Sequence, residues 1–274
     1  MPFEMNELEN AFLKYHEFKN NSSSNHERFI FPYLCGTYFT YRKIDVMRVV
    51  AIAKSISSHP KYLDVGCGYG DFLARIREFI PDATGIEKDA NIFYTFNKIK
   101  PDHISTIDVS WGEEKFDVVF VGWMDPGVDY RRYVAKCTKC IITTFDTGGQ
   151  CGLNGACEYE DLGFHRVAWW RTPAWIDVNY EIMNKYYTKM TKDVYERLHK
   201  LRGAHNLWYV YAKKEIASVI NNGLKSWIKN EIKLLNDRFE FESILDDCGF
   251  GYNEEIPILV SKEKVLWKVI FDDE

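Results

Sequence analysis

Short apolar runs alternate with helical apolar repeats in the first half of the chain. Runs rich in β-branched and aromatic residues predict strands, and apolar residues that recur every three to four positions predict helices. The predicted strands cover residues 61–65, 83–86, 104–107, 116–121 and 140–145. The helices predicted between them cover residues 72–80, 90–98 and 130–135. This alternation predicts a parallel sheet joined by right-handed crossovers.

The pattern changes after the fifth predicted strand. Residues 164–170 and 207–212 predict two further strands, and the Tyr-, Met- and Lys-rich segment 180–201 between them has a helical pattern. An amphipathic helix is predicted at 215–238 and an edge strand at 265–271. The second half of the chain therefore adds strands to the sheet without continuing the regular alternation.

Charge and length narrow the class of protein. The chain has 274 residues, 35 of them basic and 40 acidic, and a formal net charge of −5. Proteins that depend on phosphate contacts usually carry a basic excess, so nucleic acid is disfavoured as a partner. No run of about 18 apolar residues is present, and the acidic start lacks the parts of a signal peptide. We expect a cytoplasmic protein with no membrane partner.

Four cysteines have a spacing that invites a zinc interpretation. Cys137 and Cys140 lie at the start of the fifth predicted strand, and Cys151 and Cys157 follow its end. A strand of that length separates the two pairs by roughly 18–20 Å, too far for one tetrahedral site unless the later loop folds back. We therefore predict no metal site and interpret the cysteines as small apolar residues.

A glycine-rich turn follows the first predicted strand. Residues 63–72 read Leu-Asp-Val-Gly-Cys-Gly-Tyr-Gly-Asp-Phe. Glycines allow a tight turn and close approach of a ligand, and the helix that follows offers free N–H groups. A dinucleotide site requires a third glycine at position 71, but that residue is Asp71 and the third glycine is Gly70. Glu87, which ends the second strand, stands where a carboxylate can accept hydrogen bonds from ribose hydroxyls.

These features resemble the class I S-adenosylmethionine-dependent methyltransferases over residues 60–146 and the later strand pair. The resemblance implies an enzyme with S-adenosylmethionine as cofactor: Asp64 and the glycines form the turn beside its methionine part, Glu87 holds the ribose, and Asp108 and Val109 hold the adenine. The cofactor-binding residues expected from it are Asp64, Gly66, Cys67, Gly68, Gly70, Glu87, Lys88, Asp108, Val109, Gly122 and Tyr41. Tyr38 is an alternative to Tyr41.

The resemblance also implies an overall organisation. We expect an α/β, doubly wound core over residues 59–214 with a mostly parallel seven-stranded sheet and an antiparallel last strand. A helical N-terminal lead-in covers 1–58, and a C-terminal helical extension covers 215–274. A helical insert at 178–203 between the last two strands is a candidate lid, or alternatively an interface.

The sequence identifies the residues around the methyl acceptor less specifically than those around the cofactor. Residues 122–127 read Gly-Trp-Met-Asp-Pro-Gly and lack the second proline of many amino-group methylases. Trp123, Asp125 and Thr147 are the candidate substrate residues. Asp125 and His165 are the candidate catalytic residues, the second as a general base. The alternatives are a turn role for Asp125 and a structural role for His165, and core packing rather than a cation–π cage for the aromatic stretch 169–187.

Three functions remain open. The first is methyl transfer to a small molecule or a protein acceptor. The second is aminopropyl transfer from decarboxylated S-adenosylmethionine, which Asp125 and Asp129 would suit as ligands of a polyamine. The third is a catalytically silent scaffold that binds a nucleoside, because a fold does not fix a function.

Overall fold

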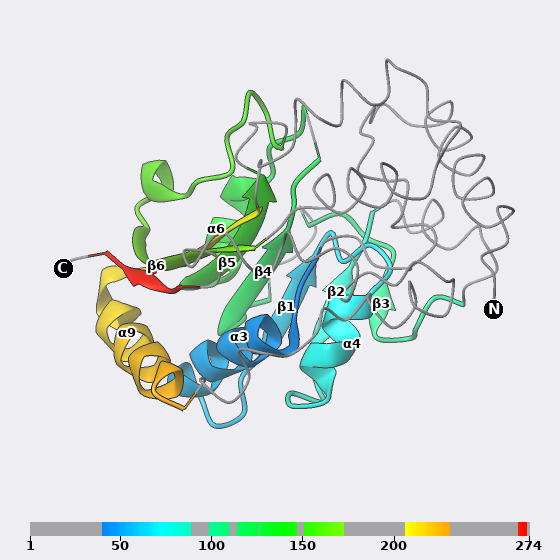
Figure 1. The fold of residues 1–274 in the computed structure, drawn as a ribbon. Coiled ribbons are helices and arrows are strands. Elements are labelled where there is room, and N and C mark those ends of the chain that lie inside the picture. Colours follow the sequence, from blue (N-terminus) through cyan, green and yellow to red (C-terminus); the bar gives the residue numbers. More distant parts are fainter. Residues whose placement is uncertain are drawn as a thin grey trace, which may run out of the picture.

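The computed structural model describes residues 40–88, 99–109, 114–125, 127–146, 151–172, 206–230 and 268–272 (Figure 1). The helix predicted at 90–98, the insert at 178–203 and most of the lead-in and of the C-terminal extension lie outside these residues.

Eight strands in the described part of the chain form one sheet, in the order β3-β2-β1-β4-β5-β7-β6-β8. Their bounds are β1 Tyr62–Val65, β2 Thr84–Ile86, β3 Ile104–Ser105, β4 Val118–Gly122, β5 Cys140–Asp146, β6 His165–Thr172, β7 Asn206–Ala212 and β8 Ile270–Phe271. Strands β1 to β5 pair in parallel, whereas β7 is antiparallel to both β5 and β6, and β8 is antiparallel to β6. The fold is a doubly wound, Rossmann-like α/β fold.

Two long helices pack side by side on one face of this sheet (Figure 1). They are α3, Lys43–Ile56, and α9, Lys214–Ile228. Helix α3 buries an apolar stripe that includes Val49, Ile52 and Ala53, and α9 buries Ile220 and Leu224. The spacing of these residues at three and four positions places each set on one helix face. The two helices thus share one hydrophobic core with the sheet.

Three shorter helices follow strands or loops. They are α4, Asp71–Arg77, α6, Arg131–Cys137, and the 3₁₀-helix η3, Glu160–Leu162. The chain steps from β1 outward to β2 through α4, and from β4 in the other direction to β5 through α6. Because crossovers between parallel strands are right-handed, α4 and α6 cover opposite faces of the sheet.

An aromatic cluster fixes α4 against the centre of the sheet. The ring of Phe72, in the first turn of α4, lies 4.7 Å from Phe120 of β4 and 5.8 Å from Trp208 of β7, measured between centroids. Trp208 in turn stacks on Trp170 of β6 at 5.3 Å. Aromatic side chains bury large apolar areas, so this cluster sets the position of the helix that follows the glycine-rich turn.

The sequence-based predictions match most strands to within two residues at each end. The prediction was too long for β3, which among the described strands pairs with β2 alone and ends at Ser105. The sheet has one strand more than the seven expected, because Ile270–Phe271 of the predicted edge strand pairs with β6. None of the helices within the described ranges is long and apolar enough to cross a membrane.

Candidate cofactor site

The candidate site lies where the sheet changes direction, between β1 and β4. The chain moves from β1 to β2 on one side, while β4 and β5 lie on the other side. Ligands of open α/β sheets bind outside the carboxyl ends of the strands at such a point. The turn after Val65, the carboxyl end of β2 and the loop after Gly122 all lie at this edge.

The glycine-rich turn requires its glycines. Gly66, Gly68 and Gly70 have φ angles of 69°, 53° and 70°, in the left-handed region that disfavours residues with a Cβ. The Gly70 amide donates to the carbonyl of Cys67 at 2.8 Å, and α4 begins directly afterwards at Asp71. The backbone therefore closes around a compact turn at the start of a helix.

Glu87 joins this turn to the end of β2. The Gly68 amide donates a buried hydrogen bond of 2.9 Å to Oε2 of Glu87. The Glu87 amide in turn donates to the carbonyl of Ser105 at the end of β3. The carboxylate predicted to hold a ribose thus lies directly against the predicted cofactor turn.

Carboxyl groups dominate the electrostatics of the turn. Burial raises the pKa of the Asp64 carboxyl well above its usual range, and the negative charges of Asp71 and Glu87 raise it further. These carboxyl groups suit ribose hydroxyls and a positively charged ligand better than the pyrophosphate of a dinucleotide. These residues fit a ligand that carries a ribose, an ammonium and a sulfonium.

Cys67 and Gly85 pack below the turn. A Cβ at Gly85 would stand 2.9 Å from the Cys67 sulfur and 2.6 Å from Cδ2 of Leu73, so only glycine fits there. Burial raises the pKa of the Cys67 thiol, and the charges of Asp64 and Glu87 raise it further. Cys67 is therefore a neutral packing residue.

The predicted adenine residues lie beside the end of β2. Nζ of Lys88 lies 3.6 Å from a carboxylate oxygen of Asp108, and Val109 is buried. Because the Lys88 side chain is largely exposed, this ion pair stabilises the fold little. The structure thus brings Lys88 and Asp108 together at the edge that carries Glu87.

The loop after β4 has an unusual backbone. Trp123 is buried and has a φ of 72°, which is rare for a bulky residue. Holding such a residue in the left-handed region costs about 1–3 kcal/mol, and strain of this kind clusters at functional sites. Gly122 is buried at the end of β4, whereas Asp125 is exposed.

Two tyrosines lie next to the turn. The ring of Tyr41, just before α3, makes an edge contact with Phe72 at 4.9 Å. Tyr130, which the sequence did not single out, places its hydroxyl 3.4 Å from where a Cβ on Gly66 would be. No motif marks Tyr130, because its approach to Gly66 depends on how the loop after β4 returns across the sheet edge.

Other predicted residues lie elsewhere. His165 is exposed at the amino end of β6, paired with Ala212. Seven residues of strand, about 23 Å, separate it from the carboxyl end of β6, so its position does not suit a general base in this site. Thr147 and Tyr38 lie outside the described residues.

The four cysteines considered for zinc also lie apart in the fold. Cys137 and Cys140 flank the amino end of β5, and Cys151 and Cys157 follow its carboxyl end. Within the described ranges, no group of three His, Cys, Asp or Glu side chains is arranged to hold a metal ion.

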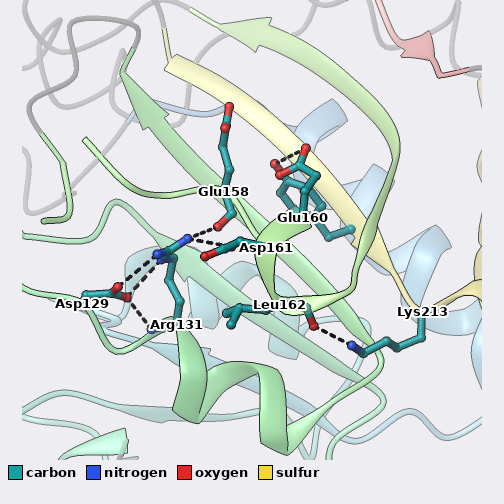
Figure 2. A network of polar contacts seen from close by, with 8 residues as sticks. Asp129, Arg131, Glu158, Glu160, Asp161, Leu162 and Lys213 are labelled. Atoms are coloured by element: carbon teal, nitrogen blue, oxygen red, sulfur yellow. Dashed lines mark hydrogen bonds and ion pairs between the residues drawn. The ribbon is translucent and has the colours of Figure 1, made fainter. Parts of the chain in front are cut away.

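A polar network fixes the wall beyond the β4 loop (Figure 2). Arg131 donates from Nε and one terminal nitrogen to both carboxylate oxygens of Asp129, each at 3.0 Å. Its other terminal nitrogen donates to Asp161 at 3.0 Å and to the main-chain carbonyl of Glu158. We call these four residues the Arg131 clamp. It holds the start of α6 to the segment around η3.

Backbone hydrogen bonds fix the same loop from a second direction. The Gly152 amide donates to the Met124 carbonyl at 3.1 Å, and the Gly127 amide donates to the Gly152 carbonyl at 3.0 Å. The loop after β4 is therefore held by the segment that follows β5 as well as by the Arg131 clamp.

Comparison with known proteins gives only distant likenesses. No family model matches the chain, and no curated protein matches it. A solved structure of magnesium protoporphyrin IX methyltransferase (ChlM) from Synechocystis PCC 6803 with bound SAM is similar over 74% of this chain and 91% of that one, with 12% identity and a TM-score of 0.39.

Two further solved structures are similar to the chain over different shares of its length. The cyclopropane synthase MmaA2 from Mycobacterium tuberculosis is similar over 62% of this chain and 84% of its own, with 14% identity and a TM-score of 0.41. The sugar N-methyltransferase KedS8 from Streptoalloteichus sp ATCC 53650 is similar over 37% of this chain, with 20% identity and a TM-score of 0.28, and the match spans about half of its length (47%).

The sheet itself identifies the fold. Its first seven strands form the mostly parallel sheet with an antiparallel last strand that the sequence resemblance predicted. The chain has the fold of class I methyltransferases.

Proposed function

We propose that the protein is an S-adenosylmethionine-dependent methyltransferase that acts on a small molecule or a protein. The observation that carries the proposal is the buried hydrogen bond from the Gly68 amide to Glu87. It places a carboxylate suited to ribose against a glycine turn, at the sheet edge where ligands of this fold class bind.

The acidic surroundings of the turn support this cofactor over a phosphate-rich one. Asp64, Asp71 and Glu87 would face the cofactor, whose ammonium and sulfonium are cationic, and the Glu87 carboxylate would accept hydrogen bonds from ribose hydroxyls. When bound, S-adenosylmethionine supplies an already activated methyl group. The chain's own residues then need mainly to align the acceptor and exclude water.

The acceptor side of the proposal rests on Trp123 and Asp125. Trp123 is buried and Asp125 is exposed in the loop after β4. In the proposal Trp123 would pack against an apolar part of the acceptor, and Asp125 would orient a polar group of it. Proton removal by Asp125 is a second role that the proposal allows. Aromatic residues make up 16% of the chain and its net charge is −5, which favours a small molecule or a protein over nucleic acid.

Calorimetry with the Glu87→Gln variant tests the cofactor assignment. Glutamine retains an oxygen that can accept from the Gly68 amide, but it loses the charge and one acceptor for the ribose. We expect S-adenosylmethionine to bind the wild type with one site and to bind the variant about ten- to a hundredfold more weakly.

Glu78→Gln is the matched control, because Glu78 is an exposed residue at the end of α4 that pairs with Arg75. Equal affinity of the wild type and Glu87→Gln would overturn the assignment. Tighter binding of decarboxylated S-adenosylmethionine would favour aminopropyl transfer instead. Cofactor binding without transfer of a labelled methyl group to any component of a cell extract would favour a silent scaffold.

A further inference from the structure

Tyr130 connects the two loops that form the candidate site. It directly precedes α6, at the end of the loop after β4, and its hydroxyl reaches the turn after β1. The hydroxyl oxygen would stand 3.4 Å from a Cβ at Gly66, which is ordinary contact distance. A ligand lying over Gly66 would therefore lie within reach of this hydroxyl.

The surroundings of Tyr130 keep its hydroxyl protonated. Burial raises the pKa of the phenol well above its usual range, and the negative charges of Asp125 and Glu87 raise it further. A phenol that keeps its proton is a neutral hydrogen-bond donor. It is an uncharged donor beside a turn whose carboxyl groups repel anions.

The Arg131 clamp fixes the backbone next to Tyr130. Arg131 follows Tyr130 directly, and its amide as well as its side chain donates to Asp129. The same guanidinium bonds Asp161 and the carbonyl of Glu158, which belong to the segment that follows β5 (Figure 2). The main-chain and side-chain contacts of Arg131 therefore fix the position of the backbone that carries Tyr130.

We propose that Tyr130 is a binding residue for the methionine part of the cofactor, donating a hydrogen bond to its carboxylate, and that Arg131 is the residue that positions it. This rests on the proposed function. The carboxylate is the one anionic group of the cofactor, and it would lie near Asp64, Asp71 and Glu87. A neutral donor offsets their repulsion without adding a charge. Tyr130 would thus favour the carboxylated cofactor over its decarboxylated form.

Two ligands separate the methionine part from the nucleoside part. S-adenosylhomocysteine carries the carboxylate and the ammonium, whereas methylthioadenosine carries neither. We measure binding to the full chain by calorimetry. We expect Tyr130→Phe to lower the affinity for S-adenosylhomocysteine about ten- to a hundredfold and to leave the affinity for methylthioadenosine unchanged. Tyr133→Phe is the matched control, since Tyr133 lies one helical turn further along α6 and is 43% exposed.

Arg131→Lys tests the positioning role, because lysine keeps the charge but lacks the planar pair of donors. We expect Arg131→Lys to lower the ratio of the affinity for S-adenosylhomocysteine to the affinity for methylthioadenosine. In the Tyr130→Phe background we expect the same substitution to leave this ratio unchanged. A purely structural residue would weaken both ligands alike.

The outcomes distinguish this inference from the proposed function. Equal changes for both ligands, or none, in Tyr130→Phe would overturn the role of Tyr130 while leaving cofactor binding intact. If Arg131→Lys lowers the affinity ratio as much in the Tyr130→Phe background as in the wild type, Arg131 does not act through Tyr130 and its positioning role is overturned. If the wild type binds neither ligand, the proposed function fails and this inference fails with it.

Discussion

At the scale of single residues, the candidate site is defined by acidic groups held close together under partial burial. Asp64 is the last residue but one of β1, and Asp71 is the first residue of α4. Glu87 approaches from the neighbouring strand. Burial and the negative charges of Asp71 and Glu87 make ionisation of Asp64 unfavourable in the absence of a cation. The site is therefore prepared for a positively charged ligand at a cost to the stability of the ligand-free fold.

This cost predicts a pH dependence of stability. The pKa of Asp64 is raised in the folded state above its ordinary value of 3.8, so the folded state holds the proton more tightly than the unfolded state. The contribution of Asp64 is then fully present below about pH 4 and is lost as pH rises through the folded-state pKa. Relative to Asp64→Asn, the wild type should lose stability between pH 4 and pH 8 in thermal melts. A constant difference over that range would contradict the raised pKa.

The residues of the site differ in how far the sequence revealed them. The glycine turn, Glu87 and Asp108 follow from motif and strand order. Tyr130 and Gly85 do not, because their roles come from contacts with Gly66 and Cys67 that no local pattern encodes. His165 was a reasonable candidate by residue type, but its place at the amino end of β6 becomes visible only with the strand directions.

At the scale of secondary-structure elements, hydrophobic periodicity was sufficient for β1, β4, β5 and the start of α9. Each of these has a strong apolar run or stripe that the sheet or α3 buries. The helix was predicted to extend to residue 238, but α9 ends at Ile228. The prediction was poorer for β3, where Ile107 is 46% exposed and follows the end of the strand. An apolar residue at a sheet edge extends the pattern without extending the hydrogen bonding.

The contact between α3 and α9 provides a test at this scale. A Cβ at Gly223 of α9 would stand 2.4 Å from Cβ of Ser55 in α3. Alanine favours a helix over glycine by about 1 kcal/mol, but overpacking a tight contact costs about 1–3 kcal/mol. We expect Gly223→Ala to lower the free energy of unfolding in urea titrations, and much less so in a Ser55→Gly background. Stabilisation by Gly223→Ala in the wild-type background would show that α3 and α9 can move apart to accommodate the added methyl group without a net loss of stability.

At the scale of the whole molecule, a buried polar group joins α3 to β6, which lies toward one end of the sheet. Nε1 of Trp170, on β6, donates to Asp45 of α3 at 2.8 Å, and a terminal nitrogen of Arg48 lies 3.8 Å from the same oxygen. Burial raises the pKa of Asp45, and the charge of Arg48 and the hydrogen bonds from Arg42 and Trp170 oppose this. Two segments 125 residues apart in the sequence thus satisfy each other's buried hydrogen-bonding groups.

Removing this long-range hydrogen bond should destabilise the protein. Trp170→Phe keeps a ring beside Trp208 but takes away the donor to Asp45, which leaves part of a buried carboxylate unsatisfied. We expect a loss of about 1–3 kcal/mol in the free energy of unfolding. Trp169→Phe is the control, because Trp169 is only partly buried on the neighbouring position of β6. Equal losses in the two variants would mean that ring size, and not the hydrogen bond, determines the effect.

Long-range pairs of this kind explain why the sequence gives the sheet more readily than the site. Strand order follows from alternation and handedness, which are local or general rules. The pairing of Asp45 with Trp170 depends on where α3 packs against the sheet. The pairing of Arg131 with Asp161 depends on how the loops after β4 and β5 meet. The contact of Arg131 with Asp161 fixes a wall of the site, and neither contact could be predicted without the structure.

The central claim is that a nucleoside cofactor binds at the carboxyl ends of β1 and β2 with its ribose on Glu87. A crystal structure of the protein with S-adenosylhomocysteine tests this most directly. The account predicts density for the ligand over the Gly66–Gly70 turn, with ribose hydroxyls within hydrogen-bond distance of the Glu87 carboxylate and the methionine carboxylate beside Tyr130. Density for the ligand at any other place, or a ribose that makes no contact with Glu87, would contradict it.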